Sequence, residues 1–115
     1  MINMSVAEFL AARKEPYGPG LKPGVYVLKN KETGQAYVGQ STCPSQRVFT
    51  HLSGRGNGDV YMDVQLGDRF DVCFYALDDA QFHDLNELEV HMIRIFEADT
   101  KGYNRQSGNR CRNAS

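Results

Sequence analysis

The chain has 115 residues, which suits a single domain, and its 41% hydrophobic residues, 23% charged residues and net charge of −1 are ordinary for a globular protein. No run approaches the ~20 apolar residues that span a bilayer, and the first residues lack the pattern of a secretory signal, so we expect no membrane association. Its three cysteines form no C-x-x-C pair, which argues against a disulfide framework or zinc ribbon and favours a cytoplasmic protein.

Charge is distributed unevenly along the chain. Residues 13–55 hold seven Lys or Arg against two acids, residues 78–99 hold seven acids against one Arg, and residues 101–112 hold four bases and no acid. Such alternation permits a basic face that binds nucleic acid on a nearly neutral protein. The same alternation also fits ordinary solvated surfaces, so charge alone does not decide between a nucleic-acid-binding face and a solvated one.

The first predicted element is a short helix near the N-terminus. Ser5 and Glu8 have the spacing of a capping box, and Phe9 and Leu10 are its expected buried residues. Proline and glycine residues end this helix. We assign residues 1–20 to an accessory helix and linker.

A β-hairpin follows. Residues 24–28 and 36–39 are short runs rich in β-branched and aromatic residues, and the polar connection between them contains the turn formers Asn30 and Gly34. Glycine weakens a strand, so the glycine that ends the second run requires a reason, such as the close approach of a helix or a ligand.

The next predicted helix begins with Thr42 as its cap, has a proline in its first turn and ends near Ser53. Arg47 and His51 are four residues apart and form a stripe separate from the apolar one. That apolar stripe consists of Val48, Phe49 and Leu52.

Three more elements complete the domain. Asp59 is expected to cap a short helix over residues 60–66, residues 70–77 form a third strand, and residues 83–98 form a long helix. Glu89 lies inside the apolar face of that helix. The apolar face comprises Leu85, Leu88, Met92, Ile95 and Phe96.

Some of these residues are unusual for a purely structural role. A carboxylate on an apolar face is costly to bury unless it is paired or binds a metal, which makes Glu89 a candidate ligand. Arg47 and His51 could hold and polarise a phosphate. The alternatives are a Glu89 that reaches solvent or pairs with an arginine, and an Arg–His pair that is only solvated.

Other candidates have equally simple explanations. Tyr26 and Tyr37 could be cross-strand aromatics that stabilise the hairpin, and Asn104 could be a turn residue. The cysteines and histidines match the spacing of no common zinc site, and no sequence signature of a nucleophilic triad is present.

The order and spacing of these motifs carry more information than any one of them. The tripeptides Gly24-Val25-Tyr26 and Tyr37-Val38-Gly39 are separated by ten residues, Arg47 follows eight residues after the second, and His51 four residues later. Together with Glu89 and the sequence Gly102-Tyr103-Asn104, they resemble the GIY-YIG endonuclease family in the same order.

The resemblance implies a fold. It is an α+β domain with a three-stranded antiparallel sheet flanked by helices, which agrees with the elements predicted above. The nuclease domain would cover residues 21–105, followed by a basic tail over residues 106–115.

The resemblance also implies a reaction, the hydrolysis of a phosphodiester bond in DNA with one divalent ion. Glu89 would bind Mg²⁺ or Mn²⁺, hard cations that suit oxygen ligands. Arg47 would stabilise the negative charge of the transition state. Tyr26, with Tyr37 or His51 nearby, would position or deprotonate the attacking water.

Asn104 would support this site by hydrogen bonding.

The sequence departs from the family in one chemical respect, because many members place a lysine just before or just after the second motif. Here those positions hold Gln35 and Gln40. The cation that lowers the pKa of the tyrosine would then be another lysine of the hairpin, or His51 would act as the base.

Nucleic-acid binding is expected to involve Gly39 and basic residues outside the catalytic motifs, which are Arg55, Arg105, Arg110 and Arg112. Such phosphate contacts would be sensitive to salt and poor in sequence information.

A compact nuclease of this kind would suit a phage or another mobile element and would use a homodimer or a partner protein for site specificity. The alternatives are a non-catalytic nucleic-acid-binding module and an RNA-directed nuclease, although no aromatic platform for stacking bases is evident.

Overall fold

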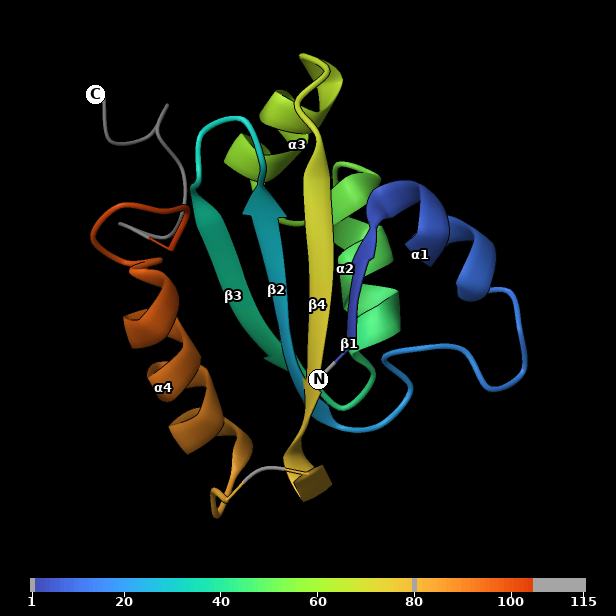
Figure 1. Ribbon diagram of the computed structural model, residues 1–115, viewed down its shortest axis with the longest axis vertical. Helices are drawn as coiled ribbons and strands as arrows, with labels where there is room; N and C mark the ends of the chain where they lie inside the picture. The colour runs from blue at the N-terminus through green and yellow to red at the C-terminus, as the bar shows by residue number, and fades with distance from the viewer. Residues whose placement is uncertain (1, 80, 105–115) are drawn as a thin grey trace.

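A computed structural model describes residues 2–79 and 81–104 of the protein. Its strands form one antiparallel sheet in the order β1-β4-β2-β3, with helices packed on both faces (Figure 1). The strands are β1 (Ile2–Ser5), β2 (Gly24–Asn30), β3 (Ala36–Ser41) and β4 (Phe70–Ala76). The helices are α1 (Val6–Ala12), α2 (Pro44–Leu52), α3 (Gly58–Gln65) and α4 (Leu85–Phe96), with a 3₁₀ turn η1 (Leu77–Asp79) after β4.

The expected α+β class is confirmed, but the sheet has one more strand than the three predicted. β1 pairs with β4 in antiparallel register, with Asn3 opposite Cys73. The Cys73 thiol donates a hydrogen bond of 3.3 Å to the Asn3 side-chain oxygen. A four-residue strand is too short to show a periodic pattern, and its partner lies far away in the sequence, so the local sequence gave no indication of it.

The predicted hairpin is confirmed. β2 and β3 pair in antiparallel register, with Val27 opposite Val38. The side-chain oxygen of Asn30 accepts hydrogen bonds from the backbone N–H groups of Glu32 and Thr33, and Gly34 has a φ of 80°. The turn therefore uses an asparagine that organises the backbone and a glycine that adopts the left-handed conformation.

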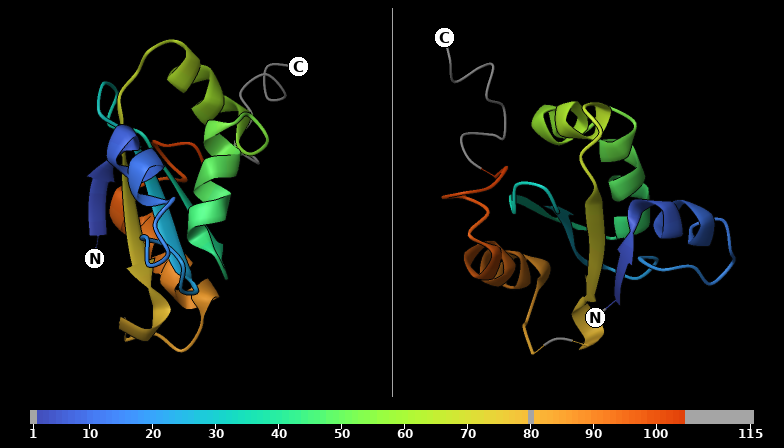
Figure 2. Two further views of the ribbon diagram at one scale, coloured as in Figure 1. Left: turned by 90° about the vertical axis from the view of Figure 1, so that its right-hand side faces the viewer. Right: turned by 45° about the horizontal axis from the view of Figure 1, so that its top comes forward.

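The sheet separates two hydrophobic clusters. α1, α2 and α3 contribute to one cluster, which includes Tyr26, Leu28 and Phe74. α4 packs on the other face through Leu88 and Met92. Figure 2 shows α1 and α2 near each other and apart from α4. Because both faces of β2 are covered, this strand is a nearly continuous apolar run rather than an alternating one.

The helix starts differ in detail from the prediction. The capping box of α1 is present, since Ser5 and Glu8 exchange side-chain to backbone hydrogen bonds. Thr42 does not cap α2, which begins after Cys43 without a side-chain cap. Instead the Ser41 hydroxyl accepts a hydrogen bond of 2.9 Å from the Cys43 N–H, so the serine organises the turn into the helix.

The later helices also start and end elsewhere than predicted. Asn57 rather than Asp59 caps α3, because the Asn57 side-chain oxygen accepts a hydrogen bond from the Val60 N–H. Asp84 caps α4 in the same way, and this helix ends before Glu97, a residue in the left-handed conformation. None of the described helices is long and apolar enough to cross a membrane.

Three residues expected in the core are exposed instead. Ile95 is 57% exposed because the buried arc of α4 is centred near Met92, and a position three residues later lies about 60° around the helix from it. Leu10 and Phe49 are also exposed. The Arg13 guanidinium lies 3.9 Å from the centre of the Phe49 ring and so covers part of it.

Candidate active site

Tyr26 and His51 form the centre of the candidate site. Tyr26 projects from β2 toward α2, and its hydroxyl lies 2.9 Å from Nε2 of His51 on the last turn of that helix. His51 is 1% exposed and therefore belongs to the buried face of α2 rather than to the separate stripe that we predicted. Arg47, one turn earlier, is exposed as expected.

The second ring nitrogen of His51 fixes the direction of the bond to Tyr26. The backbone N–H of Asn57 donates a hydrogen bond of 2.8 Å to Nδ1 of His51, so Nδ1 carries no proton. A neutral imidazole then has its proton on Nε2, and this N–H donates to the oxygen of Tyr26. We therefore assign the Nε2–H tautomer, in which the hydroxyl proton of Tyr26 points away from His51.

Two glycines make this arrangement possible. A Cβ added at Gly39 would lie 2.4 Å from the Cζ atom of Tyr26, so the tyrosine ring needs a glycine on the neighbouring strand. A side chain at Gly56 would likewise collide with the His51 ring, which the loop before α3 contacts directly. The close approach that we expected at Gly39 is therefore that of the Tyr26 ring, and Gly39 itself is buried.

Burial and the charge of Arg47 set the protonation states of Tyr26, Tyr37 and His51. Burial raises the pKa of Tyr26, the neighbouring Tyr37 raises it further, and the Arg47 guanidinium opposes both. Burial also raises the pKa of Tyr37. The pKa of His51 is lowered to about 4, chiefly by burial and also by the positive charge of Arg47. At neutral pH both tyrosines are protonated and His51 is neutral.

Tyr37 lies at the junction of the two halves of the site. Its ring centre is 4.7 Å from that of His51 and 6.2 Å from that of Tyr26. The charge of Arg47 lowers its pKa, whereas the charge of Glu89 raises it. The charges of Arg47 on α2 and Glu89 on α4 therefore act on the same hydroxyl in opposite directions.

Glu89 approaches from the other face of the sheet. Successive residues of β3 point to opposite faces, so Gln40 faces α4 while Gly39 faces Tyr26. The Gln40 amide donates a 3.3 Å hydrogen bond to Glu89 and a 2.6 Å bond to Asn86. Glu89 is half-buried, and none of the ion pairs among residues 2–79 and 81–104 involves it.

These surroundings fit a single hard cation. Within the described residues no group of three or more His, Cys, Asp or Glu side chains could hold a metal, so Glu89 would be one carboxylate ligand among oxygens from water and substrate. Mg²⁺ commonly binds through one or two carboxylates together with substrate phosphates. Gln40 donates a hydrogen bond to the Glu89 carboxylate without neutralising its charge.

Asn104 supports β3 from outside the sheet. Its side chain accepts a hydrogen bond from the Val38 N–H and donates one to the Val38 carbonyl, both 2.8 Å long. The Tyr103 N–H donates to the Ala36 carbonyl at 2.9 Å. Segment 102–104 thus covers the free edge of β3 at Ala36 and Val38.

The structure brings together six of the sequence-predicted residues and leaves others apart. Arg55 is exposed in the loop after α2, whereas Arg105, Arg110 and Arg112 lie outside the described residues. Sequence reasoning missed Asn57, whose place in a glycine-rich loop suggested only a flexible connection. The six residues are Tyr26, Tyr37, Arg47, His51, Glu89 and Asn104.

The candidate site thus combines tyrosines from β2 and β3, an arginine and a histidine from α2, and a carboxylate from α4. The family model of the GIY-YIG catalytic domain matches residues 22–104, and the chain therefore belongs to this family of nucleases. Neither the curated proteins nor the solved structures contain a match to the chain.

Proposed function

We propose that this protein is a divalent-metal-dependent DNA endonuclease that hydrolyses phosphodiester bonds with one metal ion. The observation that carries the proposal is the Tyr26–His51 pair packed against Tyr37, whose hydroxyl feels the charges of both Arg47 and Glu89. A guanidinium for the phosphate, a carboxylate for a cation and a phenol for water are the groups that this reaction needs.

Arg47 binds the scissile phosphate. Its guanidinium is exposed, always charged and shaped to contact two phosphate oxygens at once. The negative charge on these oxygens increases as water attacks, so the attraction is strongest in the transition state. Arg47 thereby accelerates the step instead of only binding substrate.

Tyr26 orients the attacking water. Its hydroxyl first releases its own proton to solvent, and the resulting tyrosinate oxygen accepts a proton from the water as the water attacks. The pKa of Tyr26 is raised by burial, so forming tyrosinate requires compensation. The Nε2–H of His51 points at the oxygen that becomes negative, and the charge of Arg47 acts in the same direction. These two groups take the place of the lysine that many GIY-YIG members carry beside the second motif.

His51 is a positioning residue in this mechanism and not the base. Its Nδ1 is occupied by the Asn57 N–H and its Nε2 proton by Tyr26. To accept a proton, His51 would have to break the hydrogen bond from Asn57. Holding the Tyr26 oxygen in place and stabilising its charge requires no such change.

Glu89 holds the metal ion, and Gln40 orients the Glu89 carboxylate. When bound, Mg²⁺ or Mn²⁺ stabilises the negative charge on the leaving 3′ oxygen. Asn104 keeps the strand between the two halves of the site in place. Arg55, together with Arg105 and Arg110, is proposed to grip the DNA backbone.

Cleavage of supercoiled plasmid with Mg²⁺ or Mn²⁺ tests the proposal. Glu89→Gln keeps the size of the side chain but removes its charge, and we expect it to lower the cleavage rate by about 10²-fold or more, as EDTA should for the wild type. Glu87→Gln is the matched control, because Glu87 lies on the same helix and is exposed. Equal cleavage by Glu89→Gln and wild type would refute the metal-binding role.

Other outcomes identify the alternatives. DNA binding without cleavage by wild type would favour a non-catalytic binding module. Cleavage of an RNA strand but not of plasmid would favour an RNA-directed nuclease. The ratio of nicked to linear plasmid distinguishes single-strand cutting from the paired cutting expected of a homodimer.

A further inference from the structure

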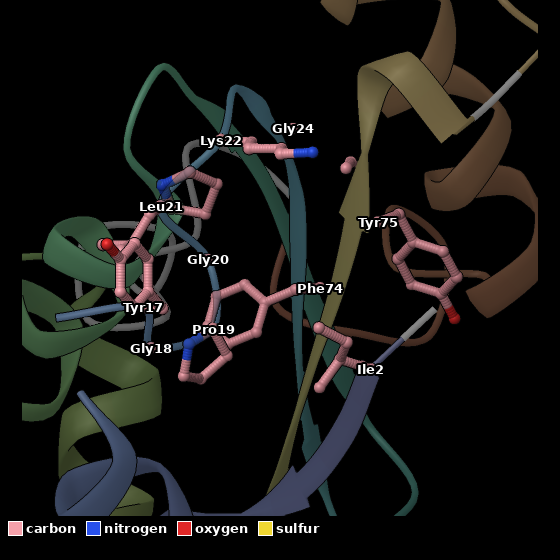
Figure 3. A pocket seen from close by; sticks show the side chains of 12 residues that line it. Ile2, Tyr17, Gly18, Pro19, Gly20, Leu21, Lys22, Gly24, Phe74 and Tyr75 are labelled. Carbon is pink, nitrogen blue, oxygen red and sulfur yellow. The ribbon is translucent and has the colours of Figure 1, made fainter. Parts of the chain in front are cut away.

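A pocket lies beside the candidate site, between the loop over residues 17–22 and the end of β4. Figure 3 shows it, with Phe74, Pro19 and Ile2 around its floor and Tyr17 at its side. The cavity has a volume of about 330 Å³, and its walls are mainly apolar. That volume is at the lower end of the range of small-ligand pockets, which suits a single planar ring system.

The floor of the pocket is held by the packing of the loop. Gly20 has a φ of 75°, and a Cβ there would lie 2.6 Å from the Phe74 ring, so the loop backbone rests directly on that ring. The Ser45 N–H at the start of α2 donates a 2.8 Å hydrogen bond to the Gly20 carbonyl. The pocket is therefore preformed and not dependent on a mobile loop.

Tyr17 is 97% exposed, against 47% for the exposed lining residues Ile2 and Leu21. An aromatic side chain without packing partners contributes nothing to the stability of the fold, but its ring faces are available to a ligand. Lys22, at the rim, forms an ion pair of 3.3 Å with Asp78 in which both side chains are exposed. Such a pair is weak, so a phosphate can compete for the lysine.

The pocket is continuous with the catalytic elements. Gly24, in its wall, precedes Tyr26 by two residues of β2, a separation of about 7 Å along a strand. Pro44, also in its wall, precedes Arg47 by almost one turn of α2, or about 5 Å. Successive nucleotides rise about 3.4 Å along a strand, so the pocket lies within a few nucleotides of a phosphate held by Arg47.

We propose that this pocket binds an unstacked nucleobase of the substrate strand, a few nucleotides from the bond that is cut. The base stacks on Tyr17 and lies against the apolar floor, while Lys22 neutralises an adjacent phosphate. This inference rests on the proposed nuclease function and adds a substrate preference to it. Because an unpaired base has little stacking to lose, the pocket favours single-stranded or branched substrate over uninterrupted duplex.

The test measures binding without cleavage. The Glu89→Gln protein in EDTA is titrated into a fluorescent DNA strand about 15 nucleotides long, and into the duplex of the same sequence, at one ionic strength. We expect Tyr17→Ala to weaken single-strand binding by about 5-fold or more, because stacking on an aromatic residue contributes this much per base. Tyr17→Phe keeps the ring and should retain the affinity.

Two controls separate stacking from other effects. Leu66→Ala removes another exposed apolar side chain, on the residue that ends α3, and should leave binding unchanged. A strand with abasic positions offers phosphates but no rings, so Tyr17→Ala and its parent should bind it equally.

The inference is overturned if Tyr17→Ala binds the normal single strand as tightly as its parent, or if it weakens single strand, duplex and abasic strand by the same factor. In either case, continued plasmid cleavage by the wild type would leave the proposed function standing. A wild type that neither binds nor cuts any nucleic acid would overturn both.

Discussion

Replacing Gly39 with alanine should disable the site while leaving the rest of the fold intact. The added Cβ would meet the Tyr26 hydroxyl and would lie 2.4 Å from Cζ of the same ring, whereas ordinary contacts are 3.4–4 Å. The Tyr26 ring must therefore move by about 1 Å or more. β3 cannot move instead, because Asn104 holds the neighbouring Val38 through both of its backbone groups.

Two effects of this displacement can be estimated. Overpacking a buried site costs about 1–3 kcal/mol, which for a domain of this size lowers the melting temperature by roughly 4–12 °C. A misplacement of about 1 Å in a catalytic group can reduce the rate by about 10²-fold. The loss of activity should therefore be much larger than unfolding at the assay temperature can explain.

The assay pairs thermal unfolding with plasmid cleavage at a temperature well below the transition. Gly58→Ala is the control, because a Cβ at that position, the first of α3, meets nothing within 4 Å. It should match wild type in both measurements. If Gly39→Ala also cuts and melts like wild type, the packing of Tyr26 against β3 does not position the catalytic hydroxyl.

Two further predictions concern His51 and Asn104. Because the pKa of His51 is lowered to about 4 from 6.5, the unfolded chain binds a proton that the folded protein does not, so the free energy of unfolding should fall as pH decreases from about 6.5 toward 4. Urea unfolding across this range should show a slope of up to about 1.4 kcal/mol per pH unit that is reduced in His51→Gln, and equal slopes would contradict the assignment of a neutral buried imidazole. Asn104→Ala removes both hydrogen bonds to Val38 and should lower the free energy of unfolding by about 1–2 kcal/mol while accelerating amide exchange at Val38. Unchanged exchange at Val38 would mean that this side chain does not secure the strand edge.

Features encoded by local sequence were predictable. The hairpin depends on two β-type runs around Asn30 and Gly34, and the α1 cap depends on two residues three positions apart, so each could be identified within a short window. The motif spacing predicted that six side chains share one site, and their common role stays a prediction. The spacing could not show that Arg47 and Glu89 belong to helices packed on opposite faces of the sheet.

Features that depend on the path of the chain were not predictable. β1 forms because β4, which lies much later in the sequence, offers an open edge, as the pairing of Ile2 with Phe74 shows. The hydrogen bond from Asn57 to His51 depends on how closely the loop returns to the end of α2. The only feature of the sequence that indicates this hydrogen bond is Gly56, a small residue next to the donor. Small residues are common in loops for many other reasons.

The cover that segment 102–104 provides for β3 has a consequence for the order of events during synthesis. A slip of β3 by one residue would exchange Tyr37 and Gly39 for Val38 and Gln40 on the face toward α2. Asn104 opposes that slip, and it leaves the ribosome after every other residue proposed for the reaction. A growing chain therefore cannot secure the register of β3, and with it the arrangement of the candidate site, until residue 104 has left the ribosome.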